Sequence, residues 1–470
     1  MRKGWYYTGR FSFHKTHCPY SYREPAYSLN SPPVPASPRI IPRAEHDISR
    51  ARISPNALKV LYRLKDAGYE AYLVGGGVRD LLLGREPKDF DIATSARPEE
   101  LQTLFRNCRL IGRRFRLAHV RFGREIIEVA TFRAPHDIAE DEGDAALSEE
   151  GRILRDNVYG TFEQDAWRRD FTINALYYDI RDFSVVDHTG GVGDIREGVL
   201  RLIGDPEVRY REDPVRMLRA VRFAAKLGFR IEAASEAPLF ELAPLLADVA
   251  PARLFDEVLK LFQGGAAVQS FELLRHYGLF GVLFPATEAA LAREVDGFPL
   301  TFLLRALENT DRRVNEGKPV TPAFLFAALL WEPVRLRVRD LANDELGELP
   351  ALQIAAAEVA SEQTRRISLP KRFSLPMREI WTQQPRFSQR QGKRPMRLMA
   401  HPRFRAAYDF LCLRAQVGEI DAELCEWWTR LQETDEAGQQ QLLESAGRPE
   451  GARRKRRRRS RARKAKPSDA

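Results

Sequence analysis

The chain has 470 residues, of which 44% are hydrophobic and 30% are charged. This composition is typical of a globular protein, and the length exceeds what one core supports, so we expect about two to four domains. The longest apolar run, residues 323–331, is much shorter than the roughly 20 residues that cross a bilayer, and no apolar secretory segment is visible. These features exclude a membrane-spanning protein from the expected classes.

The net charge of +10 is concentrated near the C-terminus. Residues 451–470 contain 11 of the 75 basic and one of the 65 acidic side chains, so residues 1–450 contain 64 of each. Like charges at this density repel one another and leave no core to form, so this tail is predicted to be disordered. RNA bound through counterion release is its expected partner, with anionic lipids or acidic proteins as alternatives.

Cysteine usage and the N-terminal residues give two further expectations. The four cysteines show no metal-ligand or disulfide-framework spacing, which favours a reducing cytosol and a cytoplasmic protein. Residues 1–45 are rich in proline and aromatic residues without periodicity, so we expect a disordered extension. An organelle-targeting segment and a misassigned translation start both remain open for these residues.

The first predicted helix covers residues 54–66. Ser54 is a typical N-cap, Pro55 suits the first helical position, and Gly68 ends the helix. A short apolar strand at residues 71–74 follows, and it leads into Gly75.

Three glycines and two acids make the most informative stretch of the chain. Gly75, Gly76 and Gly77 allow backbone N–H groups to approach an anion where a helix begins. Asp89 and Asp91 are two apart on a predicted strand, so their side chains project from the same face. Two adjacent carboxylates need a cation, and Mg²⁺ is the natural candidate because it prefers oxygen ligands. A phosphate site beside a metal site indicates phosphoryl or nucleotidyl transfer.

The next elements are predicted to complete one sheet. A helix is expected at residues 98–105, and residues 117–122 and 125–132 alternate like the arms of a hairpin around Gly123. Glu128 in the second arm could join the acids or face solvent, and the sequence leaves both open. Residues 135–151 read as an acidic loop near the site.

A second polar cluster follows at Arg168, Arg169, Asp170 and Asn174. Adjacent arginines offer fixed donor forks for a triphosphate, and Asn174 can hydrogen-bond sugar or phosphate. Asp170 can accept from a ribose hydroxyl or support the metal-binding acids. The residues alone do not choose between these roles.

The strings GGGVRDLLLG, DFD and RRDFTINAL together resemble the motifs of class II nucleotidyltransferases of the polymerase-β superfamily. That family contains the CCA-adding tRNA enzymes and the bacterial poly(A) polymerases. The resemblance extends over about residues 40–445. It implies an α+β fold, in which an N-terminal head with a small mixed sheet precedes an all-helical neck, body and tail.

The resemblance also divides the chain into five parts and implies roles for its residues. Asp170 would be the third essential acid beside Asp89 and Asp91, and Gly75, Gly76, Arg79, Arg168, Arg169 and Asn174 would hold ATP. The expected parts are an extension at 1–45, the head at 46–184, a neck at 185–265, a helical RNA-binding body at 266–445 and the basic tail at 446–470.

A helix that opens near Pro214 carries the implied base-reading pair. Asp213 and Arg216 are three residues apart and so lie on one face of a helix, although Asp213 next to Pro214 could simply be an N-cap. A carboxylate with a guanidinium fits both adenine and cytosine, so this pair alone cannot choose ATP over CTP.

Basic residues without acids gather at residues 386–405, where aromatic side chains are interleaved. This pattern suits a surface that follows an RNA backbone, although a solvated helix face is an alternative. The predicted RNA-binding residues are Arg390, Lys393, Arg394, Arg397, Arg403, Arg456, Arg457, Arg458 and Arg459.

The string LIGRRFRLAHV and the basic tail resemble the poly(A) polymerase branch of the family. The expected reaction is template-independent transfer of AMP from ATP to RNA 3′ ends, with release of pyrophosphate. Two Mg²⁺ ions at Asp89 and Asp91 would activate the 3′-hydroxyl and stabilise the leaving group. A monomer is expected, and an RNA-degradation complex is a possible partner. The alternatives are a CCA-adding enzyme, a non-catalytic RNA-binding regulator and, least supported, a membrane-surface scaffold.

Overall fold

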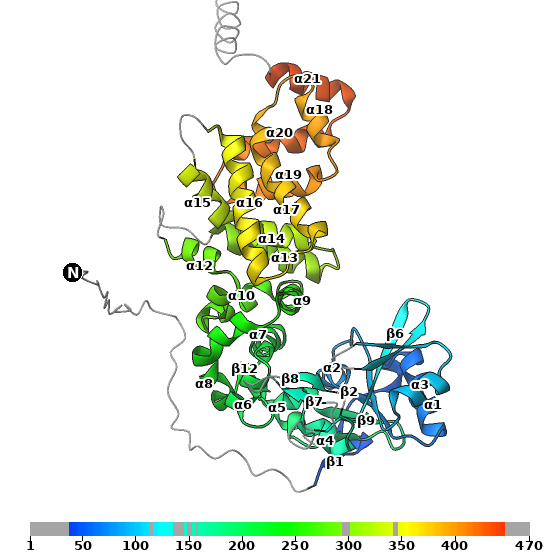
Figure 1. The fold of residues 1–470 in the computed structure, drawn as a ribbon. Helices are drawn as coiled ribbons and strands as arrows, with labels where there is room; N and C mark the ends of the chain where they lie inside the picture. The colour runs from blue at the N-terminus through cyan, green and yellow to red at the C-terminus, as the bar shows by residue number, and fades with distance from the viewer. Residues whose placement is uncertain are drawn as a thin grey trace, which may run out of the picture. The chain divides into compact units, whose positions relative to one another are not determined.

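The computed structural model describes residues 37–112, 116–134, 145–147, 153–156, 158–293, 301–341 and 346–446. A mixed sheet with flanking helices occupies the N-terminal part, and the remainder is mostly helical (Figure 1). This arrangement confirms the expected α+β fold.

The main sheet has eight strands in the order β1-β10-β9-β2-β3-β6-β5-β4. Neighbouring strands pair antiparallel, except β3 and β6, which are parallel. All four residues of β2 are buried, as expected for a strand inside the sheet with both faces covered. The strands are β1 (Arg39–Ile41), β2 (Ala71–Val74), β3 (Asp91–Thr94), β4 (Cys108–Ile111), β5 (Leu117–Phe122), β6 (Glu125–Thr131), β9 (Leu176–Asp179) and β10 (Val185–Asp187).

Two small strand pairs lie outside this sheet. An antiparallel pair joins β7 (Ala145–Leu147) and β8 (Ile153–Asp156), and a parallel pair joins β11 (Val199–Leu200) and β12 (Arg230–Ile231).

The first helix, α1 (Pro55–Asp66), forms as its capping residues predict. The Ser54 hydroxyl accepts hydrogen bonds from the backbone N–H groups of Asn56 and Ala57, which have no partner inside the helix. Its apolar side packs into the core of the sheet region. The other helices of this region are α2 (Gly76–Leu82), α3 (Pro98–Leu104), α4 (Phe162–Trp167) and α5 (Gly191–Glu197).

The N-terminal edge of the sheet differs from the expected boundary at residue 45. Residues 39–41 form β1, which pairs with β10, and Ile41 is buried in the core. A three-residue strand is too short to show periodicity, so no local pattern predicts it. Of the predicted extension, residues 1–36 lie outside the described part.

The helical remainder begins with α6 and continues to residue 446. One apolar cluster runs from Phe171 to Leu413 and crosses the expected neck–body boundary at residue 265 without a break. A second cluster, around Phe387, Trp427 and Trp428, forms the core of the last helices. The helices are α6 (Pro206–Glu212), α7 (Val215–Leu227), α8 (Ala233–Leu242), α9 (Pro251–Phe262), α10 (Ala267–His276), α11 (Leu279–Leu283), α12 (Pro285–Leu291), α13 (Thr301–Asn315), α14 (Pro322–Leu329), α15 (Trp331–Leu341), α16 (Glu348–Arg366), α17 (Lys371–Gln383), α18 (Arg394–Met399), α19 (Phe404–Gln416), α20 (Ala422–Glu433) and α21 (Glu436–Ala446).

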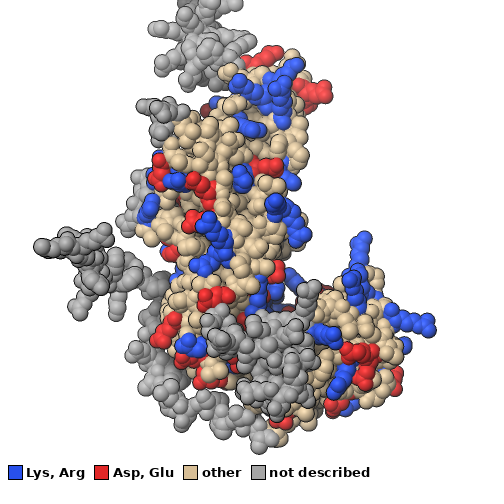
Figure 2. Space-filling model, viewed as in Figure 1, with Lys and Arg blue, Asp and Glu red and all other residues tan. Residues whose placement is uncertain are grey.

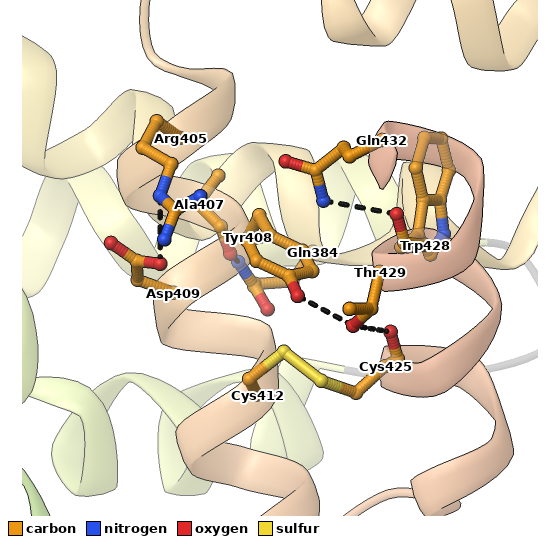
Figure 3. Close-up of a disulfide and its surroundings, with 10 residues drawn as sticks. All are labelled: Gln384, Arg405, Ala407, Tyr408, Asp409, Cys412, Cys425, Trp428, Thr429 and Gln432. Carbon is orange, nitrogen blue, oxygen red and sulfur yellow. Dashed lines mark hydrogen bonds and ion pairs between the residues drawn. A yellow bond between two sulfur atoms is a disulfide. The ribbon is translucent and has the colours of Figure 1, made fainter. Parts of the chain in front are cut away.

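Cys412 of α19 and Cys425 of α20 are joined by a disulfide (Figure 3). Beside it, the Tyr408 and Thr429 hydroxyls share a hydrogen bond of 2.6 Å, and Thr429 donates to the Cys425 carbonyl. The expectation that the cysteine spacing forms no disulfide is therefore wrong for this pair, because two consecutive packed helices bring the residues together. Among the described residues, no helix is both long and apolar enough to cross a membrane.

Candidate active site

The acid pair lies where β2 ends and β3 begins. Asp91 is the first residue of β3 and faces Val74, the last residue of β2, in the antiparallel register. Asp89 precedes the strand and is exposed, so it lies in the entering loop and not on the strand as expected. Neither carboxylate accepts a hydrogen bond or forms an ion pair within the described residues.

The electrostatics of Asp91 show a carboxylate that is only partly compensated. Burial, the Glu128 carboxylate and the Asp89 carboxylate raise the pKa of Asp91 to about 6, although the Arg169 guanidinium acts in the opposite direction. A pKa raised by neighbouring carboxylates marks a place where a cation would be favoured.

Glu128 is the neighbour that the sequence left open. It is the register partner of Asp91 in the parallel pairing of β3 with β6, so the two side chains project from the same face. Its carboxylate also lies 3.2 Å from Nε2 of His119. The signal in the sequence was the alternation of the 125–132 strand, which placed Glu128 between apolar residues but could not reveal its pairing partner.

The glycine turn lies directly against these residues. Gly75 has a φ of 72°, which favours glycine, and its N–H donates to the Leu176 carbonyl. A Cβ on Gly75 would lie 3.7 Å from Nη1 of Arg169, and one on Gly77 would lie 3.4 Å from the Asp89 carbonyl oxygen. The turn, the acid pair and Arg169 therefore occupy one place, as the sequence predicts.

The arginine pair is held by a buried acid that the sequence did not single out. Asp165 of α4 is 1% exposed and accepts from Arg168 and Arg169, at 3.0 Å each, and from the Tyr177 hydroxyl. Burial alone would raise the pKa of Asp165, but the two guanidinium groups hold it well below its usual range. Arg209 of α6 fixes the same segment by donating to the Arg168 and Arg169 carbonyls.

Arg169 keeps one donor group for a ligand. Its Nε donates to Tyr177 and its Nη2 to Asp165, whereas Nη1 points toward Gly75 and meets no acceptor in the described residues. An oriented guanidinium group beside a glycine turn is suited to bind a phosphate.

Asp170 and Asn174 are engaged by arginines. Asp170 accepts from Arg219 of α7, at 2.6 Å to Nε, from Asn174, and from the Phe171 N–H. Although burial would raise the pKa of Asp170, these partners lower it to about 2. Asn174 in turn accepts from Arg79 at 2.7 Å.

Arg79 has a different environment from the one expected for a triphosphate ligand. It is 3% exposed, donates to Asp80 and Asn174, and lies over the Phe223 ring of α7 at 5.1 Å. Its contacts tie α2 to α7, so its role in this conformation is to support the site.

The base-reading pair is also internally paired. Asp213 forms two hydrogen bonds with Arg253 of α9, at 2.5 and 2.6 Å, and accepts from the Val215 N–H. Arg216 is buried and donates to Glu212 and to the Arg209 carbonyl. Arg216 lies in the first turn of α7, as predicted, whereas Asp213 ends α6, and Pro214 and not Asp213 is the N-cap of α7. To read a base, each side chain would have to exchange its protein partner for it.

The expected RNA-binding residues lie in and around α18. Arg390 pairs with Glu423 and Arg403 with Glu379, both at 3.3 Å, whereas Arg394 and Arg397 belong to α18 itself, directly after Lys393. The tail arginines 456–459 lie outside the described residues.

No group of three or more His, Cys, Asp or Glu side chains within the described residues is arranged as a complete metal site. Asp89 and Asp91 nevertheless fit Mg²⁺, which is commonly held by one or two carboxylates together with water and substrate phosphates. The predicted contribution of Asp170 to this pair is not visible in its contacts.

Sequence profiles of three kinds match the chain. They are described as "Poly A polymerase head domain" at residues 71–201, "Probable RNA and SrmB- binding site of polymerase A" at 228–291 and "Polymerase A arginine-rich C-terminus" at 344–463. Among solved structures, the Thermotoga maritima CCA-adding enzyme in complex with tRNA is 21% identical and has a TM-score of 0.52 over 82% of this chain and 85% of that one. The fold is therefore that of the tRNA nucleotidyltransferases.

The sequence relatives show to which family within this fold the chain belongs. A CCA-adding enzyme of Leuconostoc mesenteroides is 42% identical, but over only 46% of this chain and 52% of that protein. Poly(A) polymerase I of Salmonella typhimurium is 52% identical over 91% of this chain and 92% of its own length. The chain belongs to the poly(A) polymerase I family and is a nucleotidyltransferase.

Proposed function

We propose that the chain transfers AMP from ATP to RNA 3′ ends at the site formed by Gly75, Asp89, Asp91 and Arg169. The observation that carries this proposal is the pair of carboxylates without protein partners among the described residues, next to a glycine turn and an oriented guanidinium group. Two acids left uncompensated, one with a pKa raised to about 6, are suited to divalent cations.

Mg²⁺ held by Asp89 and Asp91 would supply Lewis-acid stabilisation for in-line attack on the α-phosphorus. Glu128, next to Asp91 in the sheet, orients this edge and adds negative charge. Arg169 binds phosphate through Nη1, and Gly75 permits the close approach of the triphosphate because it has no side chain. We expect two ions, as is typical of polymerase-type sites.

We propose that Asp170 acts through position and not as a metal ligand. Its carboxylate is fully engaged by Arg219, Asn174 and a backbone N–H, so it links the segment that bears Arg169 to α7. A ribose hydroxyl could share this carboxylate without breaking the link, because each carboxylate oxygen accepts more than one hydrogen bond.

Adenine recognition by Asp213 and Arg216 stays a proposal that requires a rearrangement. Arg253 and Glu212 are the partners that a base would replace. Both are charged, and both side chains are partly exposed. The basic tail and the residues around α18 would hold the primer RNA. A monomer, a cytoplasmic location and a degradation complex remain predictions.

The test is incorporation of each of the four nucleoside triphosphates into a generic RNA primer with Mg²⁺. We expect AMP to be added repeatedly and CTP, GTP and UTP to be used poorly. A parallel reaction with CTP and a tRNA that lacks its 3′ terminus separates the CCA-adding alternative, since addition of two cytidines followed by one adenosine would contradict the proposal. Asp89→Ala, which should stop AMP addition and leave RNA binding intact, excludes a non-catalytic RNA-binding regulator.

A further inference from the structure

A cavity of about 380 Å³ lies between α13, α14, α17 and the start of α19. Its volume falls within the range of about 300–1,000 Å³ that is typical of small-ligand sites. Four arginines and one carboxylate, Asp409, are the charged residues among its described lining. The four are Arg313, Arg372, Arg403 and Arg405.

The floor of this cavity is apolar and contains flat side chains. Phe324, Phe373, Pro376 and Ile380 contribute to it. The Phe373 ring stacks on Phe255 with a distance of 5.8 Å between the ring centroids. A rigid apolar floor favours a flat ring, because aromatic faces gain both area burial and stacking.

The four arginines that line the cavity differ in whether a carboxylate forms an ion pair with them. Arg403 pairs with Glu379. Arg405 pairs with Asp409 (Figure 3). Arg313 donates to the Pro319 carbonyl, and Arg372 lies over the Phe373 ring at 4.8 Å. Neither Arg313 nor Arg372 forms an ion pair with a carboxylate in the part of the chain that the structure describes, although the Arg313 charge opposes the rise in the pKa of Asp409 that burial causes.

A second cavity in the helical part is also lined by arginines and allows a comparison. It has a volume of about 310 Å³ and is lined by Arg335, Arg339 and Arg414. Arg335 pairs with Glu332 and Arg414 with Glu419, whereas Arg339 forms no ion pair within the described residues. On the face that Figure 2 shows, Lys and Arg side chains are likewise interspersed with Asp and Glu over the helices. Positive charge alone therefore does not distinguish the first cavity, which differs in having two lining arginines, Arg313 and Arg372, without an ion pair beside an apolar lining.

We propose that the cavity binds one nucleotide of single-stranded primer RNA, with the base against the apolar floor and the flanking phosphates at Arg313 and Arg372. Proteins that hold single strands combine these two contacts, stacking for the base and cations for the backbone. A guanidinium fork matches the geometry of a phosphate. The site rests on the proposed function, and it lies outside residues 228–291, to which the family description assigns RNA binding.

The experiment compares two double variants of the full chain. Arg313→Ala with Arg372→Ala removes the two charges that form no ion pair. Arg312→Ala with Lys371→Ala removes two charges from the adjacent positions on α13 and α17, outside the cavity. Binding of labelled oligo(A) RNA is measured by fluorescence anisotropy over a series of salt concentrations.

We expect the cavity variant to bind RNA about 10-fold more weakly and to lower the slope of log Kd against log salt by about 1.4, or roughly 0.7 for each lost phosphate contact on a single strand. The control variant should change the Kd by less than about threefold. Arg313→Lys with Arg372→Lys should recover most of the salt slope, since the charges are retained, which separates a lost contact from a folding defect. Equal Kd values for the cavity variant and its control would overturn the proposal.

Two further measurements distinguish an RNA site from a lipid site and from the catalytic centre. Vesicles that contain anionic lipid serve as a second probe, and loss of vesicle binding without loss of RNA binding would overturn the assignment to RNA. At saturating RNA the cavity variant should keep the wild-type kcat for AMP addition, because the acid pair is unchanged. A wild-type chain that adds no AMP while the cavity still binds RNA would refute the proposed function and support this site.

Discussion

Two groups of carboxylates in this chain have opposite surroundings. At the sheet edge, Asp89 and Asp91 have no partner within the described residues, and the pKa of Asp91 is raised to about 6. Next to them, Asp165 and Asp170 are each surrounded by arginines that lower their pKa values.

The difference shows which acids serve the ligand and which serve the protein. A buried carboxylate that is paired with arginine has its compensation already and holds that arginine in place. A charged carboxylate left next to other carboxylates costs folding free energy that a bound cation or protonation can recover. Loss of the first group should disturb the structure, and loss of the second should disturb the chemistry.

The largest effect is expected from Asp89→Asn with Asp91→Asn. AMP addition should fall by at least about 1,000-fold, because the cation that stabilises the transition state is no longer held. RNA affinity, measured by anisotropy, should be unchanged. Glu86→Gln, at an exposed position in the same loop, is the matched control and should keep activity.

Asp165→Asn tests the carboxylates that are paired with arginines. Removing one charge of a buried ion-pair network should lower the free energy of unfolding by about 3 kcal/mol, measured by denaturant titration. The KM for ATP should rise about 10-fold while kcat changes little, since Arg169 loses its orientation and the acids keep theirs. Glu163→Gln, exposed on the same helix, serves as the control. An unchanged KM in Asp165→Asn would contradict the claim that Asp165 holds Arg169 in place.

Metal-free Asp91→Asn should be more stable than the metal-free wild type. The folded pKa of about 6 lies above the unfolded value near 4, so protonation of Asp91 stabilises the fold below about pH 4, and this stability is lost as the pH rises through about 6. Above that pH we expect the variant to gain about 2 kcal/mol in EDTA, with the gain vanishing toward about pH 4. Equal stability at pH 8 would show that Asp91 is compensated after all.

The smallest expected effect is a change in the Mg²⁺ requirement, and it distinguishes the role of Glu128 from that of Asp170. Glu128→Gln should raise the Mg²⁺ concentration for half-maximal AMP addition about fivefold to 10-fold, because a charge beside Asp91 is lost. Asp170→Asn should leave this concentration unchanged, and a double-mutant cycle with Arg219→Gln should show coupling between these two residues. A shift in metal requirement for Asp170→Asn would restore its predicted role as a third metal-binding acid.

The sequence predicted the parts of this molecule that depend on local pattern. The cap of α1, the glycine turn, the strands at 71–74 and 117–122, and the clustering of the two motifs follow from neighbouring residues. The family resemblance predicted the roles of the site residues and the architecture of a head followed by a helical part. Periodicity alone does not predict either of them.

The features that the sequence did not predict depend on contacts between residues that are far apart along the chain. The neighbour relation of Glu128 and Asp91 requires the parallel register of β3 with β6, and the arginine contacts of Asp170 and Asp213 require α7 and α9 to pack against their partners. The Cys412–Cys425 disulfide and strand β1 likewise arise from contacts that no spacing rule reports.

The most direct test is equilibrium binding of Mn²⁺, as a paramagnetic substitute for Mg²⁺, in the presence of a non-hydrolysable ATP analogue. The wild type and Glu86→Gln should bind the ion with the same affinity, and Asp89→Asn with Asp91→Asn should lose at least about 10-fold. Metal binding by the Asp89→Asn/Asp91→Asn variant at wild-type affinity would contradict the claim that these two unpaired carboxylates form the cation site.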